Sequence, residues 1–243
     1  MMKVLIKSSN LTESSIKMSK LKIYWTLRNN CPADWIEKFK SKNITFTHDP
    51  IISLKVNQNI DTLSKSIRAY DTLIITSQFA AKKFNSISNK SKVFDIFVVG
   101  EKSASILNKS NQNILYISEN INDLVKYIHE SFNKKAIHLC STKSNNRLLP
   151  KNIDIFKFYS PIENANFQIN NDNFDKNSIL VFGSPSAVDV WFKKSIDISD
   201  SSIAAIGKTT AQQIKYYTTN PLIVPSFSRV ENLCESIFNY LNK

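Results

Sequence analysis

The sequence of 243 residues contains only three glycines, Gly100, Gly183 and Gly207. The phosphate-binding loops of nucleotide enzymes and the nucleophile elbow of hydrolases each need at least two glycines a few residues apart. No two of these glycines are that close in the chain. The sequence therefore argues against a nucleotide cofactor and against a serine hydrolase of the elbow type.

Cysteine and histidine are equally scarce, with three residues of each. The cysteines are widely spaced and odd in number, which argues against a disulfide framework and suits a reducing cytoplasm. No cysteine or histidine stands in a metal-ligand or nucleophile spacing, so we predict no metal site. We interpret His129, on an expected helix, and His138, in an expected strand, as structural residues.

Long apolar runs are absent as well. The longest, such as 94–99 and 179–182, have the length of a buried strand, so we predict no membrane span. Residues 1–20 mix lysine with serine and lack the apolar core and cleavage site of a signal peptide, and we interpret them as a loose leader. The chain is long enough for two small α/β lobes, and its 42% of apolar residues is typical of a globular protein.

Basic residues outnumber acidic ones by 32 to 20, which gives a net charge of +12. Such a charge suits a nucleic acid or an anionic substrate. Lysine is spread over the whole chain, however, so most of it is expected to be solvated surface. Because no dense basic helix, zinc-finger spacing or aromatic ribonucleoprotein motif is present, we predict no nucleic-acid partner. A nucleic-acid-binding protein remains an alternative, and it would show salt-sensitive binding to DNA or RNA.

The chain also aligns with itself. Residues 71–81 match residues 178–188, each a buried strand running into a helix, with Ser77 and Ser184 as the expected N-caps. At the same shift, Gly100 falls on Gly207. Because glycine is so rare here, the shared position indicates a backbone requirement, either a positive φ or a close approach at the end of a strand.

Weaker matches extend the repeat. Residues 114–117 match 221–224, residues 21–26 match 135–140, and residues 46–50 match 156–161. The second copy also contains a capping box from Ser228 to Glu231, which predicts a helix that begins at Ser228. Strands alternating with helices in both halves predict mostly parallel sheets with helices on both faces.

In such sheets, ligands bind outside the carboxyl ends of the strands. Four hydroxyl-rich turns occupy such ends, at 76–77, 100–103, 183–186 and 207–210. Each begins a helix whose free amide groups and positive dipole end favour carboxylates or phosphates. Serine and threonine are also ordinary N-caps, which alone would explain any single turn. Recurrence of the turns favours a shared ligand cleft in which the repeated turns face each other.

These motifs resemble the uroporphyrinogen-III synthase family over residues 21–240. The family pattern has an aspartate-led strand ending in Thr-Ser, a Val-Gly-x-x-Thr-Ala turn, a Phe-x-Ser-Pro-Ser strand end and an Ala-Ile-Gly-x-Thr-Thr-Ala turn. The corresponding segments here are 71–77, 99–104, 182–186 and 205–211. Tyr159 stands where the family has its Tyr-x-Thr segment.

The sequence departs from the family pattern at three of these positions. Ser103 and Gly183 stand where the family has threonine, and Gln78 stands where a proline is common. The loop at 140–147 is polar and basic but lacks the glycine often found there. A degenerate member of the family, a two-lobed module that binds an anion or a tetrapyrrole without catalysis, therefore remains an alternative.

The resemblance implies an α/β protein with two similar doubly wound, mostly parallel-sheet lobes, which arise from an internal duplication and are joined by a two-stranded linker. Lobe 1 would contain residues 21–48 and 165–243, lobe 2 would contain 56–156, and the linker 49–55 and 157–164. The crossings between lobes are expected at the prolines at positions 50 and 161.

The resemblance also implies a function, that of a cytoplasmic, monomeric lyase of tetrapyrrole, porphyrin and haem biosynthesis that needs no cofactor. Its substrate would be hydroxymethylbilane, a linear tetrapyrrole with many carboxylates. The family closes this substrate to uroporphyrinogen III, with loss of water and inversion of the terminal pyrrole through a spiro intermediate. Catalysis of this kind acts mainly by positioning the substrate.

By the same resemblance, Tyr159 would hydrogen-bond the leaving hydroxyl and assist its departure, although an ordinary strand tyrosine would look the same in the sequence. The residues expected to contact substrate carboxylates are Ser77, Gly100, Ser103, Ser184, Ser186, Gly207, Thr209 and Thr210. Further expected anion partners are Lys102, Lys143, Arg147 and Lys208.

Overall fold

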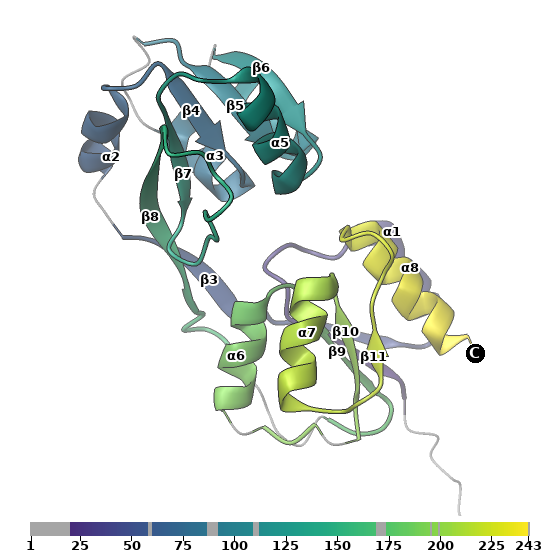
Figure 1. Ribbon diagram of the computed structural model, residues 1–243. Coiled ribbons are helices and arrows are strands. Elements are labelled where there is room, and N and C mark those ends of the chain that lie inside the picture. The colour runs from purple at the N-terminus through teal and green to yellow at the C-terminus, as the bar shows by residue number, and fades with distance from the viewer. Residues whose placement is uncertain are drawn as a thin grey trace, which may run out of the picture. The chain divides into compact units, whose positions relative to one another are not determined.

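The computed structural model describes residues 20–57, 60–86, 92–108, 112–168, 174–194, 196–198 and 200–242. These residues form two compact units, and the chain passes between them twice (Figure 1). Unit 1 contains the described residues up to Ile51 and from Asn166 onward. Unit 2 contains Ile52–Ala165.

Unit 1 is built on a five-stranded, all-parallel sheet in the order β11-β10-β9-β1-β2. Its strands are β1 (Lys22–Trp25), β2 (Thr45–His48), β9 (Ser178–Phe182), β10 (Ser202–Ala205) and β11 (Leu222–Ile223). Its helices are α1 (Ala33–Ser41), α6 (Pro185–Lys193), α7 (Lys208–Tyr217) and α8 (Val230–Leu241). On one face, Ile23 shares a core with Phe39 of α1 and Leu233 of α8. On the other face, Phe182 packs against Trp191 of α6.

Unit 2 has a six-stranded sheet in the order β3-β8-β7-β4-β5-β6, parallel except for β3. Its strands are β3 (Ile52–Val56), β4 (Thr72–Ile75), β5 (Asp95–Val99), β6 (Asn113–Ser118), β7 (Ala136–Ser141) and β8 (Ile153–Glu163). Its helices are α2 (Ile60–Ile67), α3 (Gln78–Asn85), α4 (Glu101–Leu107) and α5 (Ile121–Ser131). One core holds Leu63 of α2, Phe84 of α3 and Leu107 of α4, and a second core holds Leu124 and Ile128 of α5.

The two sheets confirm the predicted α/β class with mostly parallel strands. They also have the same strand order once the repeat is applied, because β9, β10, β11, β1 and β2 take the places of β4, β5, β6, β7 and β8. Thr72 pairs with Asp95 in unit 2 as Ile179 pairs with Ser202 in unit 1, which is the register that the stronger repeat predicts. The internal duplication itself stays a prediction.

The weaker matches at the front of each half are wrong in register. The strand pairings make Ala136 the counterpart of Ile23, whereas the predicted match gave it Lys22. On the following strand, Ile153 is the counterpart of Phe46, and the match had placed a later residue there. Short apolar runs on buried strands align almost equally well in several registers, so sequence alone selected the wrong one.

The predicted linker segments, 49–55 and 157–164, fall mainly on β3 and on the second half of β8. These two strands pair antiparallel at the edge of the sheet of unit 2. Pro50 lies beside the first passage between units, whereas Pro161 lies within β8. A role for these segments as a linker between lobes stays a prediction.

Residues 1–19 of the predicted leader lie outside the described part of the chain. Among the helices of the described ranges, none combines the length and the apolar character needed to cross a bilayer.

The capping box predicted at Ser228 is wrong. Helix α8 begins at Val230, its N-cap is Arg229, and no side chain caps it through a hydrogen bond. The hydroxyl of Ser228 lies instead against Gly207, so close that a Cβ on that glycine would be 2.2 Å from Ser228 Oγ. Contact with the neighbouring turn thus places this serine, which a local motif could not reveal.

Candidate active site

The four predicted turns lie at the carboxyl ends of strands, and each begins a helix, as predicted. In unit 2 the turns follow the neighbouring strands β4 and β5, and in unit 1 they follow the neighbouring strands β9 and β10. Because parallel strands end at the same edge of a sheet, each unit gathers two helix starts side by side.

Ser77 and Ser184 cap their helices, which confirms their predicted N-cap role. The backbone N–H of Ala80 donates to Ser77 Oγ at 3.1 Å, and the N–H of Ala187 donates to Ser184 Oγ at 3.2 Å. A serine hydroxyl has one donor and two acceptor positions. Each cap therefore keeps its hydroxyl proton for a second partner.

The backbone requirement predicted for the two equivalent glycines has a different cause at each of them. Gly100 has a φ of +82°, which side chains other than glycine rarely adopt. Gly207 is extended, with a φ of −173°, and is needed because Ser228 approaches it closely.

The residues predicted to contact the substrate differ in how much of their surface is exposed to solvent. Ser103 and Thr210 are each only 3% exposed, so their hydroxyls are turned into the protein rather than toward solvent. Thr209 is exposed and Ser186 is half-buried. Ligand contacts through the side chains of Thr209 and Ser186 stay predictions that their exposure permits, whereas Ser103 and Thr210 have little exposed surface for a ligand.

Tyr159 and Ser77, which the sequence singled out separately, are in contact. Their hydroxyl oxygens are 2.9 Å apart. Tyr159 lies on β8 and Ser77 follows β4, with β7 between these strands, so the tyrosine reaches across the end of β7. Its ring contacts Phe79 and Phe158, with centroid distances of 4.8 and 5.0 Å. Tyr159 is 7% exposed, so only a small part of it can meet a ligand.

A second polar network lies beside this pair and centres on His138 of β7, which is 2% exposed. Its Nε2 is 3.0 Å from Thr76 Oγ1, and its Nδ1 is 3.0 Å from Asn146 Oδ1. The amide nitrogen of Asn146 faces the Ser144 carbonyl at 3.4 Å, which leaves Oδ1 as the acceptor for His138. We therefore assign the proton of the neutral ring to Nδ1, and Thr76 donates to Nε2.

Burial lowers the pKa of His138 to about 4, and the hydrogen bond to Asn146 opposes this shift only in part. The ring is thus neutral at physiological pH and joins two segments of unit 2. One is the loop after β7, which contains Asn146, and the other is the turn that holds Thr76 next to Ser77. The sequence prediction that His138 is structural agrees with these contacts.

The loop after β7 borders a shallow hollow of about 460 Å³. Its lining consists of Ser144, Asn145, Asn146, Arg147, Ile155 and Lys157. Arg147 and Lys157 bring two cationic side chains to this hollow, which suits an anion. Lys143, also predicted as an anion partner, is exposed on the same loop but does not line the hollow.

The other two predicted anion partners stand at helix starts. Lys102 is the second residue of α4 and Lys208 is the first residue of α7, and both are exposed. A lysine at the positive end of a helix is repelled by the helix dipole. An anion bound there would be stabilised by the lysine and by the helix dipole together. The effect is larger at α7, because α4 has only seven residues and begins with Glu101.

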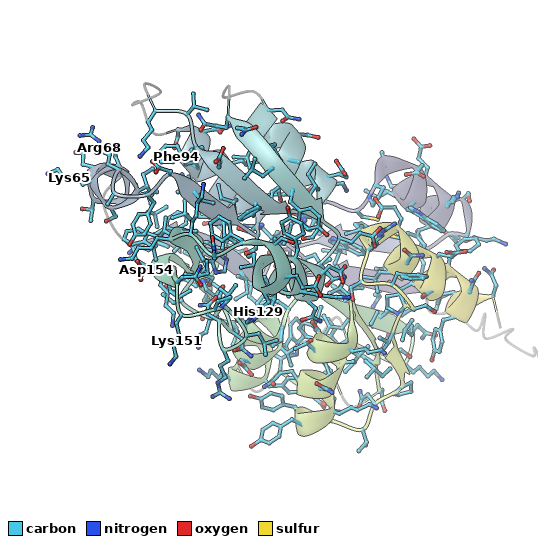
Figure 2. The ribbon with its side chains drawn as sticks, turned by 45° about the horizontal axis from the view of Figure 1, so that its top comes forward. Lys65, Arg68, Phe94, His129, Lys151 and Asp154 are labelled. Atoms are coloured by element: carbon cyan, nitrogen blue, oxygen red, sulfur yellow. The ribbon has the colours of Figure 1, made fainter. Side chains whose placement is uncertain are left out.

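His129, which is labelled in Figure 2, lies on α5. Its Nε2 is 3.0 Å from the carbonyl oxygen of Leu148, and the residue is exposed. Within the described ranges, no cluster of three or more His, Cys, Asp or Glu side chains could hold a metal ion.

The family model described as uroporphyrinogen-III synthase HemD matches residues 33–235. The chain belongs to the uroporphyrinogen-III synthase family. No curated protein matches it.

Solved structures of this family have the same fold. The uroporphyrinogen-III synthetase of Helicobacter pylori is 13% identical, with a TM-score of 0.65 over 91% of this chain and 99% of that one. A mutant uroporphyrinogen III synthase of Thermus thermophilus is 11% identical, with a TM-score of 0.56 over 91% of this chain and 99% of that one.

One departure from the uroporphyrinogen-III synthase pattern has a structural reason. A Cβ at Gly183 would lie 2.6 Å from Cγ of Leu27, a buried side chain on the neighbouring strand end. A threonine at this position would therefore clash unless Leu27 moved.

Sequence reasoning missed Thr142, Asn146 and Lys157. Thr142 binds β8 twice, through its N–H to the Tyr159 carbonyl at 2.9 Å and through a hydroxyl contact of 2.9 Å with Ser160. No short sequence motif identifies these residues, because their partners are brought close only by strand pairing. The polar character of the loop at 140–147 was the one available signal.

Proposed function

We propose that this chain cyclises hydroxymethylbilane to uroporphyrinogen III, with loss of water and inversion of the terminal pyrrole. Membership of the uroporphyrinogen-III synthase family supports the reaction. The contact between Tyr159 and Ser77 carries the mechanism, because it joins the expected catalytic tyrosine to the start of a helix.

In this mechanism Tyr159 is the general acid. The bond between the terminal carbon and its hydroxyl oxygen breaks, the hydroxyl takes the phenolic proton and leaves as water, and the pyrrole electrons form an azafulvenium cation beside the phenolate. Return of the pyrrole N–H proton to the phenolate would then give the neutral azafulvene and restore Tyr159. While Tyr159 is a phenolate, Ser77 donates its hydroxyl proton in a hydrogen bond to the phenolate oxygen, since the N–H of Ala80 occupies one acceptor position of its Oγ. The start of α3 adds the positive end of a helix dipole.

The uncatalysed closure gives the symmetrical type I isomer, so the enzyme must also hold the chain in a folded conformation. We propose that helix starts and cationic side chains beside the loop after β7 bind carboxylates of the substrate. The expected ligands at helix starts are Ser186, Thr209 and Lys208, and those beside the loop are Arg147 and Lys157. Arginine and free helix amides are well suited to carboxylates.

The test is a coupled assay in which hydroxymethylbilane reacts with and without the purified chain, and the oxidised type I and type III uroporphyrins are separated. The proposal predicts mainly type III product with the chain present. If the chain binds hydroxymethylbilane but leaves the isomer ratio unchanged, the non-catalytic family member replaces the synthase as the best reading.

The role of Tyr159 has its own test. Tyr159→Phe should lower kcat about a hundredfold with little change in KM, as expected for loss of a general acid. Tyr70→Phe is the matched control, because it removes a hydroxyl of the same unit that binds Asp154 instead. A Tyr159→Phe variant as fast as the control would exclude the acid role and leave the family reaction standing.

A further inference from the structure

One buried polar side chain of unit 2, that of His138, is bonded at both ring nitrogens to segments of the candidate site. It lies on the same face of β7 as Ala136, which belongs to the core shared with α5. The strand pairings make Trp25 its counterpart in unit 1, where that side chain is 0% exposed and packs in the core with α1 and α8. Because an indole with one donor and no acceptor fills the position there, packing alone does not call for a histidine.

The histidine differs from the tryptophan in having two hydrogen-bond partners from different parts of unit 2. Thr76 Oγ1 donates to its Nε2 at 3.0 Å, and its Nδ1 donates to Asn146 Oδ1 at 3.0 Å. Thr76 lies between β4 and α3, and Asn146 lies in the loop after β7. A buried polar group is costly to leave unpaired, so each bond holds its partner in place. The ring therefore ties both segments to β7.

The turn after β4 carries the serine that contacts Tyr159. Thr76 and Ser77 are adjacent in the chain, so a change in the orientation of one moves the other. Ser77 Oγ is 2.9 Å from the hydroxyl oxygen of Tyr159. Hydrogen bonds between hydroxyl groups are most common at about 2.7–2.8 Å and weaken with misalignment, so a small movement of the turn would weaken this contact.

The loop after β7 carries Arg147. Asn146 is half-buried whereas its neighbours Asn145 and Arg147 are exposed, so Asn146 is the residue that turns inward. Its amide nitrogen also contacts the Ser144 carbonyl at 3.4 Å and Cys140 Sγ at 3.7 Å. Asn146 and Arg147 both line the hollow beside this loop. Fixing the side chain of Asn146 therefore fixes where the side chain of Arg147 leaves the backbone.

We propose that His138 is a positioning residue of the candidate active site, a role that rests on the function proposed above. Its bond at Nε2 holds the turn after β4, and with it the contact between Ser77 and Tyr159. Its bond at Nδ1 holds the loop after β7, and with it the backbone position of Arg147. Because a displacement of about 1 Å in an active site can lower a rate about a hundredfold, each bond has a measurable consequence.

A pair of variants tests the bond from Thr76. Thr76→Val keeps the shape of the side chain and removes the hydroxyl, whereas Thr76→Ser keeps the hydroxyl. The isomer assay is run well below the unfolding midpoint of each variant. Thr76→Val should lower kcat about tenfold with little change in KM, the effect of one hydrogen bond on the barrier. Thr76→Ser should restore the kcat of the unmodified chain.

Asn146→Ala should act on binding instead. It should raise KM about tenfold with a smaller change in kcat, because Arg147 is expected to bind a carboxylate and not the reacting carbon. Ser202→Ala is the control, since it removes a buried hydroxyl 2.9 Å from that of Tyr240 at the amino end of β10. It should lower stability and leave kcat and KM unchanged. If Thr76→Val and Asn146→Ala also lose only stability, His138 merely supports the fold and the proposal is overturned.

A measurement without turnover separates this proposal from the proposed function. In a chain with isotope-labelled tyrosine rings, the NMR signal of Tyr159 is identified by its absence from Tyr159→Phe, and it reports on the contact with Ser77. Thr76→Val should shift this signal, and Ser202→Ala should not. If the unmodified chain forms no type III product, the proposed function fails, but a shifted signal still supports the positioning role. A Tyr159 signal unchanged in Thr76→Val would overturn that role, whether or not the chain is a synthase.

Discussion

The buried imidazole of His138 makes stability depend on pH in a predictable direction. The pKa of this group is lowered to about 4 in the folded chain, against an ordinary value of about 6.5 in the unfolded chain. Between these values the unfolded state takes up a proton that the folded state does not, so stability falls as the pH falls from 6.5 toward 4. The full effect is about 3 kcal/mol, of which about 2 kcal/mol is lost between pH 7 and pH 5.

Urea unfolding at pH 7 and pH 5 measures this effect. Carboxylates also titrate in this range, so the histidine is isolated by comparing the change in the unmodified chain with the change in His138→Phe. The variant is less stable at pH 7, because Thr76 and Asn146 lose their partner, but it should lose about 2 kcal/mol less on acidification.

His129→Gln serves as the control, because His129 is exposed on α5. It should show the same pH dependence as the unmodified chain. Equal losses of stability on acidification in the unmodified chain and in His138→Phe would refute the reasoning, since they would mean that the buried ring takes up its proton at an ordinary pH.

Four further outcomes are expected. Gly100→Ala should cost about 1–2 kcal/mol in urea unfolding, because its φ of +82° strains any L side chain. Gly207→Ala should also destabilise, but Ser228→Gly should largely restore stability, because the clash is with that side chain. Ser184→Ala should cost about 1 kcal/mol through loss of its cap, measured in the same way. All three cysteines are buried, so a thiol reagent at pH 8 should modify the folded chain slowly and the chain in urea rapidly.

The elements that the sequence predicted best are those with local signals. Ser77 and Ser184 cap helices after apolar strands, and both features can be recognised from neighbouring residues alone. The helix start predicted at Ser228 failed, and the side chain of that serine lies against Gly207, which is distant in the chain. Local motifs are reliable where no tertiary contact competes with them.

The candidate site was predictable only in part, for the same reason. The sequence singled out Tyr159 and Ser77 one at a time, and their contact depends on β8, β7 and β4 lying next to one another in that order. That order follows from the nonlocal pairing of strands from distant parts of unit 2, which no short motif records. Asn146 was missed because its contact with the buried histidine depends on how the loop after β7 folds back onto that strand.

The repeat therefore predicts where an equivalent residue lies better than it predicts why that residue type is needed there. Gly100 and Gly207 occupy the same place in the two copies, yet one is required by a positive φ and the other by a neighbouring side chain. Tyr24 and Ile137 likewise share a strand position, yet one lines a cavity and the other lies in a core that includes residues of α2. The two sheets share a strand order, while the residues that cover each sheet decide whether an equivalent strand position becomes core or cavity wall.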